Sequence, residues 1–385
     1  MAAEEVVVVS ALRTPICKAR RGAFSETTPD DLLLSVLAAT LSSTGLPPHL
    51  VGDVVVGNVQ QAGSFAGPAR MAALRAGIPA SVPLLALNRQ CSSGLQAVAT
   101  VAAAISAGEI AIGIGAGVES MSFGGGANPS EMPPCNANDI IAHRLASQCL
   151  VPMGMTAENV AERYGITRRE QEQVAVDSHA KALAAQASGR FDREVVPVTL
   201  EGGRVVSADE GPREGTTLER LARLKPAFKE EGSVTAGTSS QVSDGAAAVL
   251  LMKRRTAMEL GLKPLGVLRS YRVVGVQPDE MGIGPAVAIP AALSAAGITM
   301  DQVDVFELNE AFASQVAYCV RKLGIPLDKL NPSGGAIALG HPLGCTGARQ
   351  VATLLHELQR TGKRVGVVSM CVGTGMGAAA VFESE

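Results

Sequence analysis

Short apolar runs alternate with longer helical patterns along this chain, and the alternation predicts its elements. Residues 6–9 are all valine and predict a buried strand, and further strands are predicted over 51–59 and 110–122. A helix is predicted over 28–43, between the first two of these strands. It begins with a threonine, a proline and two acidic residues, which are typical of a first helical turn. Residues 93–109 predict a helix that is apolar nearly all round and therefore buried. Strands that alternate with helices indicate an α/β fold.

The last third of the chain repeats this order of elements. Asn58 and Asn309 close equivalent strands about 250 residues apart, and Thr100 and Thr353 end matching segments at nearly the same spacing. Such a spacing is far too long for a solenoid repeat. Because order, spacing and strand exits agree, a duplicated domain is favoured over chance similarity of Ala/Val-rich segments. The repeated elements are a helix at 289–298, a strand at 303–312, a helix at 347–363 and a glycine-ended strand at 364–377.

Residues 122–235 interrupt this pattern with a long polar insertion. A charged helix is predicted over 167–191, and much of the remainder is rich in loops. Long polar insertions in compact domains are usually functional or disordered, and the interspersed helices favour an ordered lid. Its basic residues offer sites for an anionic ligand, but with acidic residues among them a solvated face is an equal alternative. These basic residues are Arg204, Arg213, Arg220, Arg223, Lys225 and Lys229.

Composition and charge exclude several functional classes. The net charge of −3 and the dispersed basic residues argue against nucleic-acid binding, which normally needs a concentrated basic face. No apolar run approaches the roughly 20 residues of a membrane span. The 7 cysteines are an odd, dispersed set without a C-x-x-C pair, which fits neither a disulfide framework nor a zinc site. We therefore expect a reducing compartment, no bound metal, and thiols that are mostly small buried hydrophobes.

One cysteine, Cys91, stands immediately before Ser-Ser-Gly and the apolar helix predicted from residue 93. A thiol at the start of a helix lies near unsatisfied backbone N–H groups and the positive end of the helix dipole. We therefore expect the pKa of Cys91 to be lowered toward a usable thiolate. A buried structural cysteine is the alternative. The position at the helix start favours a nucleophile.

Two glycine-rich segments of the second half carry further candidates. His341 stands between a glycine and a proline, and it is favoured as a proton acceptor or oxyanion donor over a core histidine. Cys371 precedes Gly-Thr-Gly-Met-Gly and is a candidate proton shuttle. We expect that segment to end the last strand with no helix after it, which argues against a dinucleotide-binding loop. Strand ends of the two halves would bring Cys91, His341, Cys371 and Asn309 together.

Seven motifs in order along the chain carry a resemblance to a known family. The chain resembles the thiolase family over nearly its whole length, most closely the members that cleave 3-ketoacyl-CoA in peroxisomes. The resemblance implies the α/β thiolase fold, with two duplicated βαβαβαββ halves in a five-layered α-β-α-β-α arrangement and an inserted loop domain. We expect the first half over 1–121 and 236–262, the CoA-binding loop domain over 122–235, and the second half over 263–385. The motifs are NRQCSSGLQA, GVESMS, MGMTAENVA, SDGAAA, NEAFA, GGAIALGHPLGCTGARQ and MCVGTGMG.

The resemblance implies a role for each candidate. Cys91 would be the nucleophile that attacks the 3-keto carbon and then carries the acyl group as a thioester. His341 would activate Cys91 and bind the thioester oxygen, and Cys371 would protonate the departing acetyl-CoA carbanion and later deprotonate CoA. Asn309 would hold an oxyanion-hole water beside His341, and the backbone N–H groups of Cys91 and Gly373 would form a second oxyanion hole. These roles describe an acetyl-CoA acyltransferase, a thiolase that completes a round of fatty acid β-oxidation.

The resemblance also places the substrate. Coenzyme A would lie on the insertion as a substrate, with no permanently bound cofactor, and its pantetheine would reach toward Cys91. Pro152 stands where acetoacetyl-specific members have a histidine, which favours broader or longer-chain substrates. Thr238 stands where the family usually has asparagine, which weakens the assignment of Ser240. Met153, Ser240, Phe228 and Phe312 match pantetheine-channel positions, and Arg213 and His179 match positions near the nucleotide.

Partners, location and rival activities complete the expectations. The resemblance implies acyl-CoA and CoA as ligands and a homodimer, with a tetramer as the alternative. No nucleic acid and no integral membrane segment are expected. It also implies a peroxisome, with mitochondrion or cytosol as alternatives because no targeting signal is visible in this chain. The rival activities are a biosynthetic acetoacetyl-CoA thiolase, a decarboxylating ketoacyl synthase, which would replace Cys371 and Asn309, and a non-catalytic acyl-CoA or lipid carrier.

Overall fold

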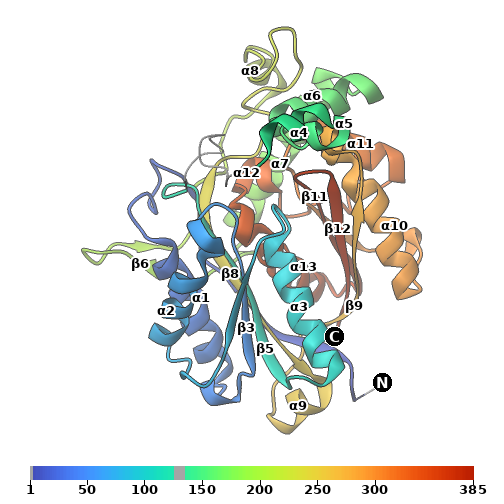
Figure 1. Cartoon of the computed structure of the whole chain (residues 1–385). Coiled ribbons are helices and arrows are strands. Elements are labelled where there is room, and N and C mark those ends of the chain that lie inside the picture. Colours follow the sequence, from blue (N-terminus) through green and yellow to red (C-terminus); the bar gives the residue numbers. More distant parts are fainter. Residues whose placement is uncertain (1–2, 125–134) are drawn as a thin grey trace.

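The strands form two halves with the same pattern of pairing (Figure 1). The computed structural model describes residues 3–124 and 135–385. Outward from their junction, the first half has the order β1-β8-β5-β3-β4 and the second β9-β12-β11-β10. In each half the first two pairings are antiparallel and the later ones are parallel. The strands are β1 Val6–Arg13, β2 Cys17–Lys18, β3 Asp53–Gly57, β4 Leu84–Leu87, β5 Ile112–Ser120, β8 Ser243–Lys253, β9 Gly266–Gly275, β10 Val305–Leu308, β11 Val365–Val372 and β12 Met376–Ser384.

Helices cover both faces of each half, which makes five layers (Figure 1). One apolar cluster joins α1 and α2 to the outer face of the first half. A second cluster joins α3 and α13 to strands of both halves, so these two helices form the central layer. A third joins α10 and α11 to the outer face of the second half. The helices are α1 Pro29–Thr44, α2 Ala66–Arg75, α3 Ser93–Ala107, α9 Arg254–Glu259, α10 Gly284–Ala296, α11 Ala313–Leu323, α12 Ala336–Leu339 and α13 Leu343–Thr361.

The shared pairing pattern confirms the predicted α/β fold with duplicated halves and five layers. β3 corresponds to β10, β5 to β11, β8 to β12 and β1 to β9. The partner of β4 in the second half is reduced to a single parallel bridge between Phe306 and Leu330. Asn58 and Asn309 each follow the last residue of the corresponding strands β3 and β10.

The central helices approach each other so closely that glycine is required between them. A Cβ on Gly94 of α3 would lie 2.6 Å from the Gly344 carbonyl oxygen of α13. A Cβ on Gly347 of α13 would lie 2.3 Å from the Leu95 nitrogen. Any side chain at these positions would push the two helices apart. The close contact fixes the starts of α3 and α13, and therefore the residues just before them, relative to each other.

The described part of the insertion contains both helices and short strands. Residues 125–134 lie outside the described part. The predicted charged helix is α7, and it begins with a capping box in which Thr167 and Glu170 satisfy each other's backbone N–H groups. Short helices cluster above the strand ends of the second half (Figure 1). The elements are α4 Ala137–Ala142, α5 Arg144–Gln148, α6 Met153–Tyr164, α7 Arg168–Ala187, β6 Val198–Thr199, β7 Val205–Val206 and α8 Leu218–Leu221.

Three predicted elements differ from the structure. The segment over 364–377 was expected to end the last strand, but it is β11 and the turn of a hairpin whose second strand is β12. The sequence from 376 onward consists of small apolar residues, which give no clear strand signal. β10 ends at Leu308, four residues before the predicted strand end, because the chain turns there toward α11. Thr28 precedes α1 as predicted, but its hydroxyl binds the Asp31 carboxylate instead of capping the backbone.

Candidate active site

Cys91 lies in a tight turn between β4 and α3. The preceding residue, Gln90, has a φ of 48°, a left-handed conformation that is unusual outside glycine. The N–H groups of Ser92 and Ser93 bond to the carbonyls of Arg89 and Gln90 and close the turn. The Cys91 side chain is almost buried, with 8% of the residue exposed. The turn therefore presents a single, nearly buried thiol at a fixed place.

The pKa of Cys91 does not follow the expectation from the helix start. Burial raises the pKa of the Cys91 thiol to about 11, although the backbone N–H groups of Gly373 and of Cys91 itself act to lower it. Loss of solvation of the thiolate outweighs the helix-start dipole because the site is closed to water. The prediction of a lowered pKa is wrong for the free protein. At neutral pH the thiol is protonated, and an attack by its sulfur requires a proton acceptor.

His341 lies just before α13 and is oriented by hydrogen bonds on both ring nitrogens. Its Nδ1 lies 2.6 Å from the Thr346 hydroxyl oxygen, and that hydroxyl donates to the Pro342 carbonyl at 2.9 Å. Because the hydroxyl proton is already used, Nδ1 carries the ring proton and Nε2 carries a lone pair. Burial lowers the pKa of His341 to about 3, so the ring is neutral. A neutral imidazole whose Nε2 carries a lone pair can accept a proton.

Asn309 faces His341 from the end of β10. Its Nδ2 lies 3.3 Å from His341 Nε2 and donates to it. Its Oδ1 has no hydrogen-bond partner within the described residues, although it is buried. A buried amide oxygen without a partner is costly unless a water or a ligand occupies the site. The orphaned oxygen is therefore compatible with a bound water at this position.

The loop that carries Asn309 is held by a network that the sequence reading did not identify. Asn331, at a φ of 41°, bonds through its amide to both the N–H and the carbonyl of Leu308. The Glu310 carboxylate accepts from Asn331 Nδ2 at 2.7 Å and from the Ser178 hydroxyl at 2.6 Å. Ser178 belongs to α7, so the insertion supports the site from behind.

Cys371 lies at the end of β11 and is fully buried. Burial raises the pKa of the Cys371 thiol, and the nearby Cys91 raises it further. Gly373 follows in the hairpin turn, where Thr374 and Gly375 have φ values of 67° and 90°. This turn directs the Gly373 N–H at Cys91. The structure thus brings Cys91, Gly373 and Cys371 together, and it joins Asn309 to His341.

A pocket of about 620 Å³ lies between the insertion and the first half. Of the predicted substrate residues, it is lined by His179, Arg213, Phe228 and Ser240. His179 Nδ1 accepts the Arg213 backbone N–H at 3.1 Å, and burial lowers the pKa of His179 to about 4. Phe312 packs at 5.9 Å from Phe228, edge to face. Phe312 and Met153 also pack against the apolar cluster that contains Cys371, so an apolar path leads from the pocket toward the thiols.

Three cations at the pocket mouth were missed by the sequence reading. Lys18, Arg20 and Arg21 line the pocket together with Arg213. Lys18 belongs to β2, which pairs with β8, and Arg20 and Arg21 follow that strand. Arg20 is held at a φ of 66° by a bond from its N–H to the Ser122 hydroxyl. The only available signal was the run "CKARRGA", whose relation to the distant Arg213 depends on tertiary structure.

Neither metal-binding clusters nor membrane-spanning helices occur in the described part of the chain. Among the described residues, no three His, Cys, Asp or Glu side chains are grouped so that they could hold a metal ion. No helix in residues 3–124 and 135–385 is long and apolar enough to cross a membrane.

Known families and proteins share this sequence and architecture. The family model described as "Thiolase, N-terminal domain" matches residues 6–255, and "Thiolase, C-terminal domain" matches residues 262–384. The rat peroxisomal 3-ketoacyl-CoA thiolase B is 60% identical over 390 residues, covering 99% of this chain and 91% of the relative. The human peroxisomal 3-ketoacyl-CoA thiolase is 58% identical with the same coverage.

Solved structures agree with these sequence relatives. The crystal structure of the dimeric peroxisomal thiolase of Saccharomyces cerevisiae matches with a TM-score of 0.95 and 48% identity, covering 100% of this chain and 98% of that one. A second structure of the yeast peroxisomal 3-ketoacyl-CoA thiolase, described as five-layered and built from two core domains of identical topology, matches with a TM-score of 0.85 and 44% identity. It covers 100% of this chain and 99% of that chain.

Proposed function

The chain belongs to the thiolase family, and we propose that it cleaves 3-ketoacyl-CoA with CoA. The products are acetyl-CoA and an acyl-CoA shortened by two carbons, the final step of a round of β-oxidation. The observation that carries the proposal is the closeness of two buried thiols, Cys91 and Cys371, in a protein whose His341 is neutral and hydrogen-bonded to Asn309. Carbon–carbon cleavage of this kind requires a nucleophile, a proton acceptor and a group that protonates a carbanion.

In the first half-reaction the Cys91 thiol transfers its proton to His341 Nε2 as its sulfur bonds to the 3-keto carbon. The resulting alkoxide is stabilised by the backbone N–H groups of Cys91 and Gly373, while His341 and the water held by Asn309 face the thioester oxygen of the leaving acetyl-CoA. The alkoxide then collapses, the C2–C3 bond breaks, and its electron pair leaves on C2 as the acetyl-CoA carbanion. Cys371 donates its proton to that carbon, which yields acetyl-CoA and an acyl thioester on Cys91.

In the second half-reaction the Cys371 thiolate takes the proton from the thiol of an incoming CoA. The CoA sulfur attacks the acyl carbon, and the tetrahedral oxyanion lies beside the N–H groups of Cys91 and Gly373. The C–S bond to Cys91 breaks, and the Cys91 sulfur recovers its proton from His341. The two steps form a ping-pong cycle that restores every proton.

Coenzyme A is assigned to the pocket next to the insertion. Arg213, Lys18, Arg20 and Arg21 provide positive charge at the mouth, which suits the phosphates of a nucleotide. The apolar path past Phe228, Phe312 and Met153 suits the pantetheine arm, which must reach the thiols. Pro152, at the start of α6, keeps the expectation of broad or longer-chain acyl groups.

A homodimer and a peroxisomal location are proposed on the basis of the relatives. The yeast structural neighbour is a dimeric peroxisomal thiolase, and several curated relatives are named as peroxisomal. β4 is an edge strand of the sheet, and Leu85 on it is 46% exposed. An apolar edge strand is a suitable surface for a second copy. A tetramer is the alternative state, which analytical ultracentrifugation distinguishes.

Thiolysis and adduct mapping test the proposal together. The protein is mixed with 3-ketoacyl-CoAs of increasing chain length and CoA, and acetyl-CoA formation is followed. In parallel, mass spectrometry of protein mixed with an acyl-CoA locates the adduct, which is expected on Cys91. Acyl-CoA binding without turnover would favour a carrier, and cleavage of acetoacetyl-CoA alone would favour the biosynthetic type. An adduct on another residue would overturn the assignment of the nucleophile.

A further inference from the structure

One wall of the CoA pocket is a strap, residues 216–242, with little regular structure. Its one helix, α8, has 4 residues. The strap contributes Leu221, Leu224, Phe228 and Ser240 to the pocket lining. A segment with so few internal backbone bonds has a high conformational entropy unless other elements hold it. The shape of the pocket therefore depends on what fixes the strap.

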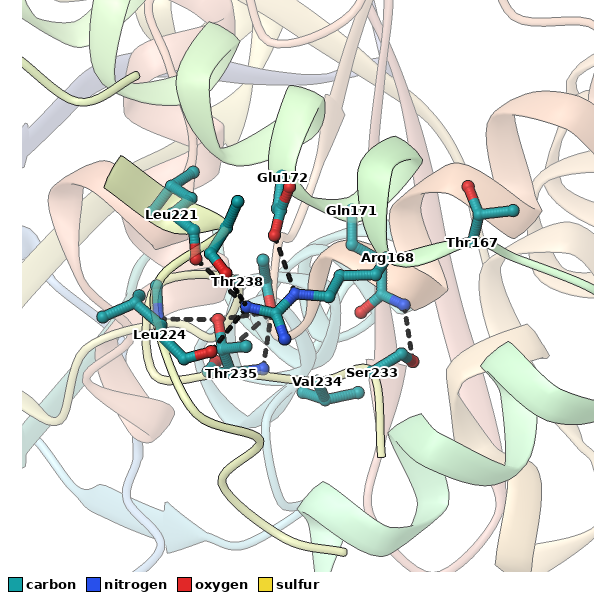
Figure 2. Close-up of polar contacts among 12 residues, drawn as sticks. Thr167, Arg168, Gln171, Glu172, Leu221, Leu224, Ser233, Val234, Thr235 and Thr238 are labelled. Carbon is teal, nitrogen blue, oxygen red and sulfur yellow. Dashed lines mark hydrogen bonds and ion pairs between the residues drawn. The ribbon is translucent and has the colours of Figure 1, made fainter. Parts of the chain in front are cut away.

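Arg168 lies beside the strap on a rigid support. It is the first residue of α7, whose start is fixed by the capping box of Thr167 and Glu170. The helix is anchored because Ala175 and Ser178 are buried. One turn along, Glu172 accepts the Arg168 Nε–H at 2.8 Å and orients the guanidinium (Figure 2). The side chain is thus held from two sides before it contacts the strap.

The guanidinium binds the strap through its backbone (Figure 2). Arg168 Nη2 lies 3.1 Å from the Leu221 carbonyl oxygen, 3.2 Å from that of Ala222 and 2.5 Å from that of Leu224. These carbonyls belong to the C-terminal end of α8 and the following turn, in which the Leu221 carbonyl also accepts the Leu224 backbone N–H at 3.0 Å. One cation therefore satisfies three acceptors, two of them on residues whose side chains line the pocket.

A second attachment holds the strap farther along. The Glu158 carboxylate of α6 accepts the backbone N–H groups of Ser233 and Val234, each at 2.9 Å. Gln171 of α7 donates to the Ser233 hydroxyl at 2.9 Å (Figure 2). The next turn closes on itself through Thr238, whose hydroxyl accepts the Thr235 N–H at 2.9 Å. α6 and α7 thus fasten the strap at two points that bracket Phe228.

The far end of the strap is joined to the active-site loop. The Ala313 N–H donates to the Thr238 carbonyl at 2.9 Å, and the Ser240 N–H donates to the Ala311 carbonyl at 3.0 Å. Ala311 packs in the same small apolar cluster as Cys371. The strap is therefore a continuous connection from the wall at Leu221 to the residues around the second thiol.

We propose that Arg168 is a positioning residue that pre-organises the nucleotide end of the CoA pocket. The inference rests on the proposed use of CoA as acceptor. Arg168 holds Leu221 and Leu224, which line the pocket together with Arg213 and His179. Without Arg168, part of the binding free energy of CoA would be spent on ordering the strap. Cys91, His341 and Cys371 are not among the residues that line this pocket, so affinity is expected to change more than the bond-breaking steps.

The test measures thiolysis of saturating acetoacetyl-CoA with either CoA or pantetheine as acceptor. Arg168→Met removes the guanidinium. The KM for CoA is expected to rise about tenfold in this variant, because a factor of ten corresponds to the loss of one or two hydrogen bonds to a charged group. The kcat is expected to stay within about twofold, and the KM for pantetheine, which has no nucleotide, to change much less. Arg169→Met is the matched control, because Arg169 is the exposed neighbour on the same helix.

Folding defects are separated from positioning by milder variants. Arg168→Lys keeps the charge but has no planar fork to span Glu172 and three carbonyls. Glu172→Gln leaves Arg168 in place without its orienting carboxylate. Both are expected to raise the KM for CoA by about threefold with unchanged melting temperatures. An unchanged KM in these folded variants, or equal changes for CoA and pantetheine, would overturn the inference. Absence of thiolysis in the unmodified protein would instead count against the proposed function.

Discussion

The two halves place an asparagine at the same strand end, and its surroundings differ. In the first half, Asn58 Nδ2 donates to the Val118 carbonyl at 2.9 Å and to Glu119 Oε1 at 3.3 Å, and Asn58 Oδ1 accepts a backbone N–H at 3.2 Å. In the second half, Asn309 Nδ2 faces His341, and Asn309 Oδ1 has no partner in the described part of the chain. One asparagine is saturated by the fold, and the other keeps an unused acceptor.

The strands next to β3 and β10, which are β5 and β11, show the same contrast. Gly57 ends β3 opposite Gly117, and Leu308 ends β10 opposite Ser369. Two residues beyond these partners stand Glu119 and Cys371, respectively. Glu119 accepts three backbone N–H groups, from Val59, Gln60 and Gly344. Burial raises the pKa of Glu119 to about 7. Duplication therefore supplied two equivalent polar edges, of which one is a structural joint and the other is the proposed reactive site.

The largest effect is expected at Cys91, the proposed nucleophile, which the first half supplies. Cys91→Ser is expected to lower acyl transfer by about a thousandfold or more, because a hydroxyl is a far weaker nucleophile than a thiol here. CoA binding, measured by calorimetry, is expected to be largely intact because the pocket is unchanged. Unchanged turnover in this variant would contradict the mechanism.

Cys371→Ala removes the reactive counterpart of Glu119. The variant is expected to become acylated slowly on Cys91 when mixed with an acyl-CoA, because the nucleophile and His341 remain. It is expected to fail to release or condense acetyl-CoA, since no group protonates or deprotonates the C2 carbon. Exchange between labelled acetyl-CoA and a ketoacyl-CoA measures this step, and a normal exchange rate would refute the assignment.

The paired asparagines give the sharpest test of the comparison. Asn309→Ala is expected to lower kcat by about a hundredfold, the usual loss of an oxyanion-site group. Asn58→Ala is expected to leave kcat nearly unchanged and to lower the free energy of unfolding by about 1–3 kcal/mol, because its hydrogen-bond partners are left unsatisfied. Steady-state kinetics and chemical denaturation of both variants measure the two effects. Similar kinetic losses in both would remove the distinction between the halves.

A further prediction concerns the protonation state of Cys91. A thiol with a pKa of about 11 deprotonates only as pH rises toward 11, so its alkylation by iodoacetamide is expected to accelerate about tenfold per unit between pH 7 and 10. A small thiol of ordinary pKa, near 8.5, levels off above about pH 9 and serves as the control. Peptide mapping resolves Cys91 from the other cysteines. A plateau already at pH 7 would indicate a thiolate paired with a charged His341.

The fold could be predicted because its signals are local. The valine run of β1, the apolar pattern of α3 and the repeated exits at Asn58 and Asn309 are readable from neighbouring residues. β8 and β12 were missed because "SDGAAAVLLMK" and "MGAAAVFES" carry small residues that neither alternate nor favour a strand. Their strand state comes from the partners on each side.

The candidate site was only partly readable for the same reason. Cys91, His341 and Cys371 stand next to helix starts or glycines, which mark them in the sequence. No helix start or glycine pattern singles out Thr346 or Asn331. Thr346 sets the tautomer of His341, and Asn331 bonds to the backbone of Leu308 as a neighbouring strand would. The pKa of Cys91 was misjudged because helix polarity can be read from the sequence, whereas exclusion of water depends on the closed turn between Cys371 and Gly375.

The close contact between Gly94 of α3 and Gly344 of α13 has a consequence for biosynthesis. The apolar surface of α3 is covered by a helix made roughly 250 residues later, and at about 5–20 residues per second the ribosome needs on the order of 10–50 seconds to supply it. During that time the nascent first half carries an uncovered apolar face. Its need for chaperone protection is therefore expected to end when α13 leaves the exit tunnel.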